Sequence, residues 1–186
     1  MGNSGIVGEL SADHQGIQQL VDQVRAAPPG SAERASLVEQ LSGRLVGHLV
    51  TERAHLLPLV RRHVADGDEW VNRFHAEDRE LQQTLATLRD TAPHGERYMA
   101  LLLSVVTAVT RHVVEMEQLL FPRLQATAPA TALRDAAAEA RETAAVAPTR
   151  PRPCAPGSPA LTKLSASFWG PWDRFRDRLT HRGRRS

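Results

Sequence analysis

Hydrophobic and polar residues follow one another along most of the chain with the three- and four-residue spacing of amphipathic helices. Each long stretch of this pattern ends at turn-forming residues, namely Pro28-Pro29-Gly30, Gly67, Pro93 and Pro129. The pattern predicts four long helices, over residues 11–27, 31–63, 68–91 and 94–127. Short links between long helices favour antiparallel neighbours. The sequence therefore predicts an all-α fold, an antiparallel up-down-up-down four-helix bundle with an extra C-terminal helix and a tail.

Two further kinds of segment follow the predicted bundle. Residues 132–146 form an Ala-rich helix that packs outside the bundle or extends it, and residues 148–159 are a Pro-rich linker. Residues 161–185 repeat apolar side chains at helical intervals among many arginines. We therefore divide the chain into a bundle with its trailing helix (1–146) and a linker with an amphipathic tail (147–186). Such a tail suits an anionic membrane surface or a protein partner; folding back onto the bundle, or disorder, is an equal alternative.

Composition narrows the class of protein. Aromatic residues make up only 4% of the chain, which suits a helical bundle better than a sandwich or a barrel. The formal net charge of +2 is too small to indicate nucleic-acid binding. Cys154 is the only cysteine, so an intrachain disulfide and a thiolate metal cluster are both excluded, and a reducing cytoplasm is the natural setting. Neither a signal peptide nor an apolar run of ~20 residues is visible. We therefore expect a soluble, cytoplasmic protein.

One histidine interrupts the apolar stripe of each predicted helix. These residues are His14, His48, His75 and His112. Each lies about 13 to 17 residues from the loop that joins its helix to the next, or roughly 20 to 25 Å at a rise of 1.5 Å per residue. The sequence therefore predicts four imidazoles that point into the bundle at about one level.

A carboxylate accompanies these imidazoles, because Glu52 follows His48 by one helical turn. Burying such groups in an apolar core costs several kcal/mol unless each has a partner. A lone histidine on an apolar face is more often a hydrogen-bonded core residue, but four at one depth favour a metal ion as the shared partner. Imidazole and carboxylate without thiolate suit iron, manganese or zinc. The segments His48 to Pro58 and His112 to Pro122 also form a loose internal repeat.

In order and spacing, these motifs resemble the hemerythrin-like (HHE cation-binding) domain family. The resemblance covers about residues 10–125 and rests on Asp13-His14-Gln-Gly-Ile17, His48-x3-Glu52, His75, and His112 followed by Glu115-Met-Glu117-Gln-Leu-Leu-Phe-Pro122. The Pro/Arg-rich tail is also similar to that of many actinobacterial members. The resemblance implies a four-helix bundle around two non-haem iron ions with an oxo or hydroxo bridge. Terminal ligands would be the four histidines, and Glu52 and an acid after His112 would be the bridging carboxylates.

Two positions depart from the pattern of the family. Oxygen-carrying hemerythrins have a second histidine four residues after the one that matches His75, where this chain has Arg79. The resemblance then implies a coordination position that is open or filled by water, with Asp78 or Glu77 as alternative ligands.

The second departure concerns the acid that follows His112. Many bacterial members have Glu four residues after this histidine, where this chain has Met116. On a regular helix Glu115 is about 60° around the axis from His112 and Glu117 about 140°, so angle favours Glu115. The spacing of oxygen-carrying hemerythrins favours Glu117, which we take as the ligand.

The leading hypothesis is a non-haem di-iron protein that binds dioxygen or a related small ligand, nitric oxide or peroxide, for binding, sensing or detoxification. Whether it turns a substrate over is left open by the ligand set. Two other functions remain as alternatives. The first is a metal-free or weakly metal-binding helical adaptor that acts through its tail, and the second is iron storage or delivery.

Overall fold

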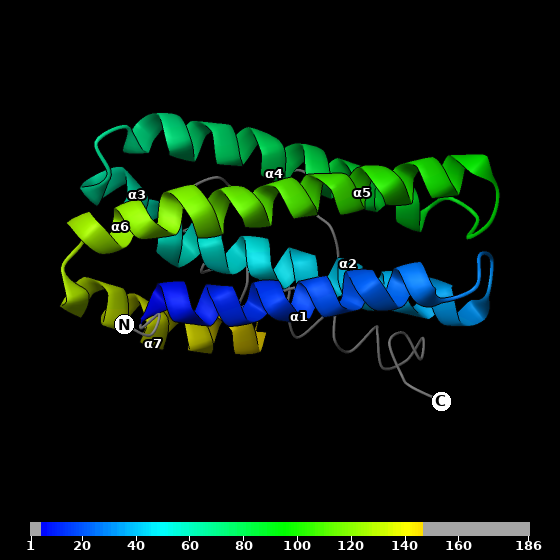
Figure 1. Cartoon of the computed structure of the whole chain (residues 1–186), viewed down its shortest axis with the longest axis horizontal. Coiled ribbons are helices and arrows are strands. Elements are labelled where there is room, and N and C mark those ends of the chain that lie inside the picture. Colours follow the sequence, from blue (N-terminus) through cyan, green and yellow to red (C-terminus); the bar gives the residue numbers. More distant parts are fainter. Residues whose placement is uncertain (1–4, 147–186) are drawn as a thin grey trace.

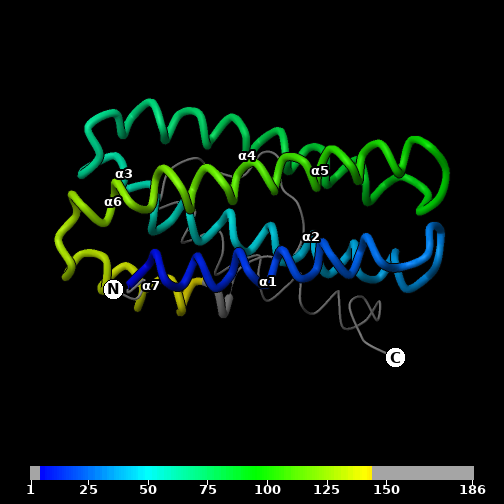
Figure 2. Tube along the Cα trace, viewed as in Figure 1, coloured from blue at the N-terminus to red at the C-terminus, as the bar shows by residue number. Residues whose placement is uncertain are grey.

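This computed structural model describes residues 5–146 of the chain. These residues form five helical segments, and a π-helical turn divides two of the segments into three elements each. The elements are α1 (Ile6–Ala26), α2 (Ala32–Thr51), η1 (Glu52–Leu56), α3 (Leu57–His63), α4 (Gly67–Arg89), α5 (Glu96–Glu115), η2 (Met116–Leu120), α6 (Phe121–Thr127) and α7 (Ala130–Val146). Between residues 5 and 146 there is no strand, as the sequence predicts. The long segments lie side by side (Figures 1 and 2), which is consistent with a four-helix bundle. The predicted linker and tail, 147–186, lie outside the described residues.

The first helix begins earlier than the sequence pattern predicts, at Ile6 in place of residue 11. Ile6 and Val7 have no exposed surface, so burial extends the helix toward the N-terminus. The helix starts after Gly5, whose φ of 75° is costly for any residue with a Cβ. A Cβ at Gly5 would lie 2.6 Å from the carbonyl oxygen of Leu133, which shows how closely α7 approaches this end of α1.

The second and fourth predicted helices are each interrupted by one π-helical turn, η1 and η2. The N–H of Leu57 donates to the carbonyl of Glu52, and that of Phe121 to the carbonyl of Met116, five residues back in both cases. Pro58 and Pro122 follow immediately, and proline has no N–H to continue an α-helical ladder. The internal repeat of the sequence therefore corresponds to a repeated wide turn, of the kind that is frequent at functional sites.

The trailing helix α7 packs on α1, α2 and η1. Its buried side chains recur every three or four residues and are Leu133, Ala137, Ala140 and Thr143. The buried His55 of η1 places its Nε2 2.7 Å from the Thr143 hydroxyl and its Nδ1 3.5 Å from the Glu139 carboxylate. The sequence left open whether this helix packs outside the bundle or extends it; it covers an outer face of the bundle.

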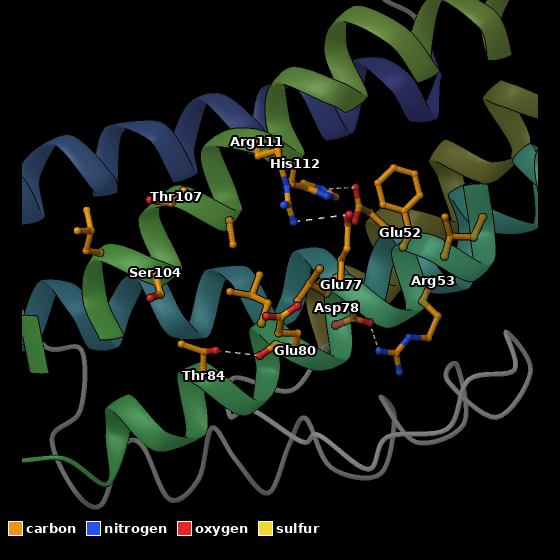
Figure 3. Close-up of a pocket in the computed structure, with 16 residues that line it drawn as sticks. Glu52, Arg53, Glu77, Asp78, Glu80, Thr84, Ser104, Thr107, Arg111 and His112 are labelled. Atoms are coloured by element: carbon orange, nitrogen blue, oxygen red, sulfur yellow. Dashed lines mark hydrogen bonds and ion pairs between the residues drawn. The ribbon is translucent and has the colours of Figure 1, made fainter. Parts of the chain in front are cut away.

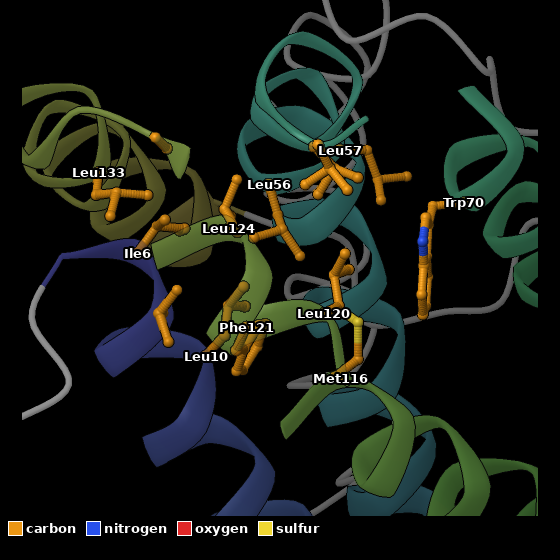
Figure 4. Packing of buried hydrophobic residues seen from close by; sticks show 14 of the residues in the cluster. Ile6, Leu10, Leu56, Leu57, Trp70, Met116, Leu120, Phe121, Leu124 and Leu133 are labelled. Atoms are coloured by element: carbon orange, nitrogen blue, oxygen red, sulfur yellow. The ribbon is translucent and has the colours of Figure 1, made fainter. Parts of the chain in front are cut away.

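Buried apolar side chains form two separate clusters along the bundle. One includes Leu10, Leu56 and Met116 (Figure 4), and the other includes Ile17, Leu49 and Val109. His14 lies between Leu10 and Ile17 in the sequence, His112 lies between Val109 and Met116, and Glu52 lies between Leu49 and Leu56. A polar layer therefore divides the apolar core at the level of these residues.

Within residues 5–146, one helix, Glu96–Thr127, is long and apolar enough to cross a membrane by length and composition alone. A single helix of this kind can occur without a membrane, and this one contributes His112 and Glu117 to the interior contacts described below. The match is therefore weak evidence for a membrane span.

Candidate metal centre

Four side chains from three helical segments meet in the polar layer: His14, His48, Glu52 and His112, here called the His–Glu group. One nitrogen or oxygen atom from each lies within 4.8 Å of the corresponding atoms of the others. His14, His48 and Glu52 are 2%, 2% and 4% exposed, and the His112 side chain is 14% exposed. The group is thus a set of side chains that could hold a metal ion, enclosed between two apolar clusters.

Outer carboxylates determine which nitrogen of each imidazole faces the centre of the group. His14 Nδ1 lies 2.7 Å from Glu117 Oε1, and His48 Nδ1 lies 2.8 Å from Asp13 Oδ2. A carboxylate only accepts, so in both rings Nδ1 carries the hydrogen. The Nε2 atoms of His14 and His48 are then acceptors in the neutral rings, and they face each other at 3.2 Å.

Glu52 adds another acceptor to the same space. Its Oε1 lies 3.2 Å from His48 Nε2 and 3.2 Å from His112 Nε2. Lone pairs that face one another in a buried site repel unless a cation lies among them. The donor set therefore fits a metal ion, and its composition of imidazole and carboxylate suits iron, manganese or zinc.

The electrostatics of the group support the same conclusion. Burial alone would raise the pKa of Glu52, but His112 and His48 hold it well below its usual range. Burial opposes protonation of His48, but Glu52 and Asp13 outweigh it and raise the pKa to about 10. Burial, together with the neighbouring His48, lowers the pKa of His14 to about 4. The acceptors therefore hold a proton on His48, and a metal ion binding to the same atoms must displace it.

His75 is not part of this group. The face of α4 that packs into the core carries Phe74 and Asp78, and the half-buried His75 lies next to Phe74 on the helix. The ring of Phe74 meets that of His112 edge-on, with centroids 5.6 Å apart. Partial burial and the nearby Arg53 lower the pKa of His75. The structure thus brings together three of the four predicted histidines, and a ligand role for His75 stays a prediction.

The alternative ligands on α4 lie beside the group. Asp78 is buried and forms an ion pair with Arg53, while also accepting from Gln82 at 2.8 Å. The Glu77 carboxylate lies 3.6 Å from Arg111. Neither belongs to the His–Glu group of the described residues. Arg79, where the sequence departs from the pattern that it resembles, is exposed.

The two acids that follow His112 have different partners. Glu117 accepts from His14 and also from the Ser11 hydroxyl at 3.1 Å. Glu115 instead forms an ion pair with Arg73 at 2.5 Å. The angles estimated for a regular helix favoured Glu115, but the wide turn η2 begins at Met116 and changes the direction of Glu117.

We therefore expect Glu117→Gln to lower the metal content of the purified protein and Glu115→Gln to leave it near the wild-type value. The reason is that only Glu117 contacts an imidazole of the His–Glu group. Elemental analysis of both variants, prepared in parallel, measures the difference. Equal metal loss from the two variants would contradict the choice of Glu117 over Glu115 as the acid that supports metal binding.

Asp13 is a residue whose role the sequence did not reveal. It accepts from His48, and its other oxygen lies 2.6 Å from a guanidinium nitrogen of Arg44. Burial would raise the pKa of Asp13, but His48 and Arg44 together hold it below its usual value. In the sequence Asp13 is one acid next to a histidine, and only the packing of α1 on α2 shows that it orients the imidazole of another helix.

Replacing Asp13 by asparagine is expected to weaken metal binding by roughly 10- to 100-fold, because carboxylates that orient a ligating imidazole have effects of that size. Competition with a chelator of known affinity measures the change. Asp22→Asn, at an exposed position on the same helix, is the matched control and should bind metal as the wild type does. Equal affinity of Asp13→Asn and the control would show that Asp13 has no orienting role.

Phe121 is a second residue that the sequence did not indicate. It is 1% exposed, and its ring stacks on that of His14 with centroids 5.7 Å apart and planes at 11°. Together with the fully buried Met116, it encloses the His–Glu group on the side of the first apolar cluster. Its position in an apolar run marks it as core, and nothing in the run distinguishes it from its neighbours.

Comparison with known proteins agrees with the site. The model of one family, the hemerythrin HHE cation-binding domain, matches residues 5–124. This range is more than half of the chain and contains all four members of the His–Glu group. The chain has no significant match among curated proteins or solved structures.

Proposed function

We propose, since the chain belongs to the hemerythrin HHE cation-binding domain family, that it is a non-haem di-iron protein. The proposed ligand is dioxygen or a related small molecule, nitric oxide or peroxide, and the proposed role is binding, sensing or detoxification. The observation that carries the proposal is the buried set of acceptor atoms from His14, His48 and Glu52 that face one another. We further propose that the helices run alternately up and down and that the protein is cytoplasmic.

The protein's own residues have distinct parts in this proposal. Glu52 holds a negative charge between His48 and His112, where it would help to hold the metal and balance its charge. Asp13 and Glu117 fix the rings of His48 and His14 through their Nδ1 atoms. The family's iron, when bound, supplies electrons for the small ligand. Apolar walls exclude water from such a site and slow its unproductive oxidation.

The side of the group that faces α4 is the proposed side for ligand binding. Among residues 5–146, α4 contributes no imidazole to the His–Glu group, and Phe74 borders His112 there. Coordination positions on this side would therefore be left to water or to the small ligand, which favours reactivity over simple oxygen carriage.

The first test is to count the metal. Protein purified under iron-replete conditions should carry about two irons per chain and show oxo-bridge absorption. Well under one iron per chain, without that absorption, would contradict the di-iron proposal and favour the adaptor function. Readily exchangeable iron would instead favour storage or delivery.

Stopped-flow mixing of the reduced protein with dioxygen, nitric oxide and peroxide then identifies the ligand, and repeated turnover distinguishes an enzyme from a reversible binder.

A contact of residues 161–185 with a membrane or a protein stays a proposal, because this segment lies outside the described residues. Liposome co-sedimentation of the full chain and of a chain that ends at residue 147 tests it. Unchanged sedimentation after the deletion would contradict the membrane contact.

A further inference from the structure

A cavity of about 440 Å³ lies between α2, α4 and α5 and reaches the His–Glu group (Figure 3). Glu52 and His112 line one end of it, and Thr84 and Ser104 lie toward the other (Figure 3). The volume falls in the range of sites for small organic molecules and is many times the roughly 30 Å³ that a water molecule occupies in the liquid. A diatomic ligand or hydrogen peroxide would leave most of this cavity unfilled.

Apolar atoms supply the larger share of the surface of the cavity. The apolar side chains that line it include Leu49, Leu81 and Ala108, and Phe74 stands beside His112. An apolar wall of this kind favours an apolar ligand body, because burial removes both surfaces from water. Glu52 and His112 supply polar groups at the end that reaches the His–Glu group, so a ligand with an apolar body can place a polar end group there.

The charges around the cavity favour an uncharged ligand. Both guanidinium groups of the lining face carboxylates, Arg53 with Asp78 and Arg111 with Glu77 at 3.6 Å. Away from the His–Glu group, an organic anion would therefore approach Asp78 and Glu77, whose guanidinium partners are already engaged. An organic cation would approach the metal ions of the proposed function. A neutral molecule avoids both costs along the whole cavity.

We propose that this cavity binds a small uncharged organic molecule with an apolar body, whose hydroxyl or hydroperoxyl end points at Glu52 and His112. The inference rests on the proposed function in one respect, that the polar end meets the metal-bearing side of the His–Glu group. An alcohol and a hydroperoxide share the recognised chemistry, an apolar body with a terminal O–H.

Isothermal titration calorimetry of the iron-loaded full chain tests the binding. The probe is 2-phenylpropan-2-ol, and its ammonium analogue 2-phenylpropan-2-amine is the charged comparison of the same shape. We expect saturable binding of the alcohol and at least tenfold weaker binding of the charged compound. Cumene hydroperoxide, the hydroperoxide of the same body, should compete with the alcohol. Absence of saturable alcohol binding, or equally tight binding of the charged compound, would overturn the proposal.

Variants locate the bound molecule. Ser104→Phe places a ring at the rim of the cavity, and the Ser104 hydroxyl bonds only to its own helix, at the Ala100 carbonyl, among the described contacts. Thr110→Phe is the matched control, because Thr110 has the same type of bond on the same helix and does not line this cavity. We expect at least tenfold weaker alcohol binding in Ser104→Phe and wild-type binding in the control.

Ala108→Phe is a second variant and fills the cavity from its partly buried wall, with exposed Ala100→Phe as its control. Far-ultraviolet circular dichroism and iron content show whether each variant is folded and loaded. Equal affinity for the alcohol in wild type, Ser104→Phe and Ala108→Phe would overturn the location. Normal iron content without alcohol binding would contradict this inference and leave the di-iron proposal standing. If the purified protein carries no iron but binds the alcohol, and Ser104→Phe removes this binding, the result would support the cavity and contradict the di-iron proposal.

Discussion

Replacing Glu52 by glutamine is expected to remove nearly all bound metal, with a loss of affinity of more than about 100-fold, beyond the 10- to 100-fold effect typical of groups that only orient a ligand. Glu52 is 4% exposed and contacts two imidazoles, so its carboxylate is the central negative charge of the group. Glutamine keeps the size of the side chain. It removes the charge and turns an N–H donor or a weaker carbonyl acceptor toward the metal position.

The measurement is metal content after purification, followed by chelator competition for any metal that remains. Glu33→Gln is the matched control, because Glu33 is exposed in the first turn of α2, the helix that leads into Glu52. It should carry the same metal content as the wild type. A Glu52→Gln protein that retains full metal with unchanged affinity would show that Glu52 is not a ligand.

Replacing Asp78 by alanine is expected to destabilise the protein by about 3–5 kcal/mol, because it leaves the buried Arg53 guanidinium without its carboxylate. Arg53 and Asp78 are 6% and 8% exposed, so the interaction is largely shielded from bulk solvent. Gln82 also loses an acceptor of its amide group. The free energy of unfolding from urea titration measures the effect, in wild type and variant at the same metal content.

Two controls distinguish a buried charge from a general loss of packing. Asp22→Ala removes an exposed carboxylate whose partner Arg25 is also exposed, and it should change stability by no more than about 1 kcal/mol. The double variant Arg53→Met/Asp78→Leu removes both charges and should recover most of the stability. If the double variant is as unstable as Asp78→Ala, the loss of stability does not come from the buried charge of Arg53 left without Asp78.

Helix positions were largely predictable because a helix that packs on one face shows its period in the sequence. The second predicted helix, 31–63, corresponds to α2, η1 and α3, and the fourth, 94–127, to α5, η2 and α6. The same period indicated which faces are buried, and His14, His48 and Glu52 are indeed buried on them. The start of α1 at Ile6 was missed because its burial depends partly on α7, which is distant in sequence.

The orientation of individual site residues was less predictable. A regular helix favoured Glu115 over Glu117, but the π-helical turn before Pro122 changes the local direction, and the family's spacing at Glu117 is the one that meets His14. The angular pattern of α4 also permitted His75 on the buried face. Packing instead turns Phe74 and Asp78 inward, with Asp78 paired to Arg53 of η1.

By itself, the sequence predicted an all-helical protein with four histidines and Glu52 on inward helix faces, because those properties depend on side chains a few residues apart. Three of these histidines meet Glu52 in the structure. The sequence motifs also indicated the family, which the family match confirms. Only the tertiary structure decided that Asp13 orients His48, that Glu117 meets His14, that His75 lies outside the His–Glu group, and that a cavity reaches Glu52. Each of these features depends on how one helix is rotated relative to another. Wide turns and buried ion pairs set this rotation, and no local sequence pattern encodes it.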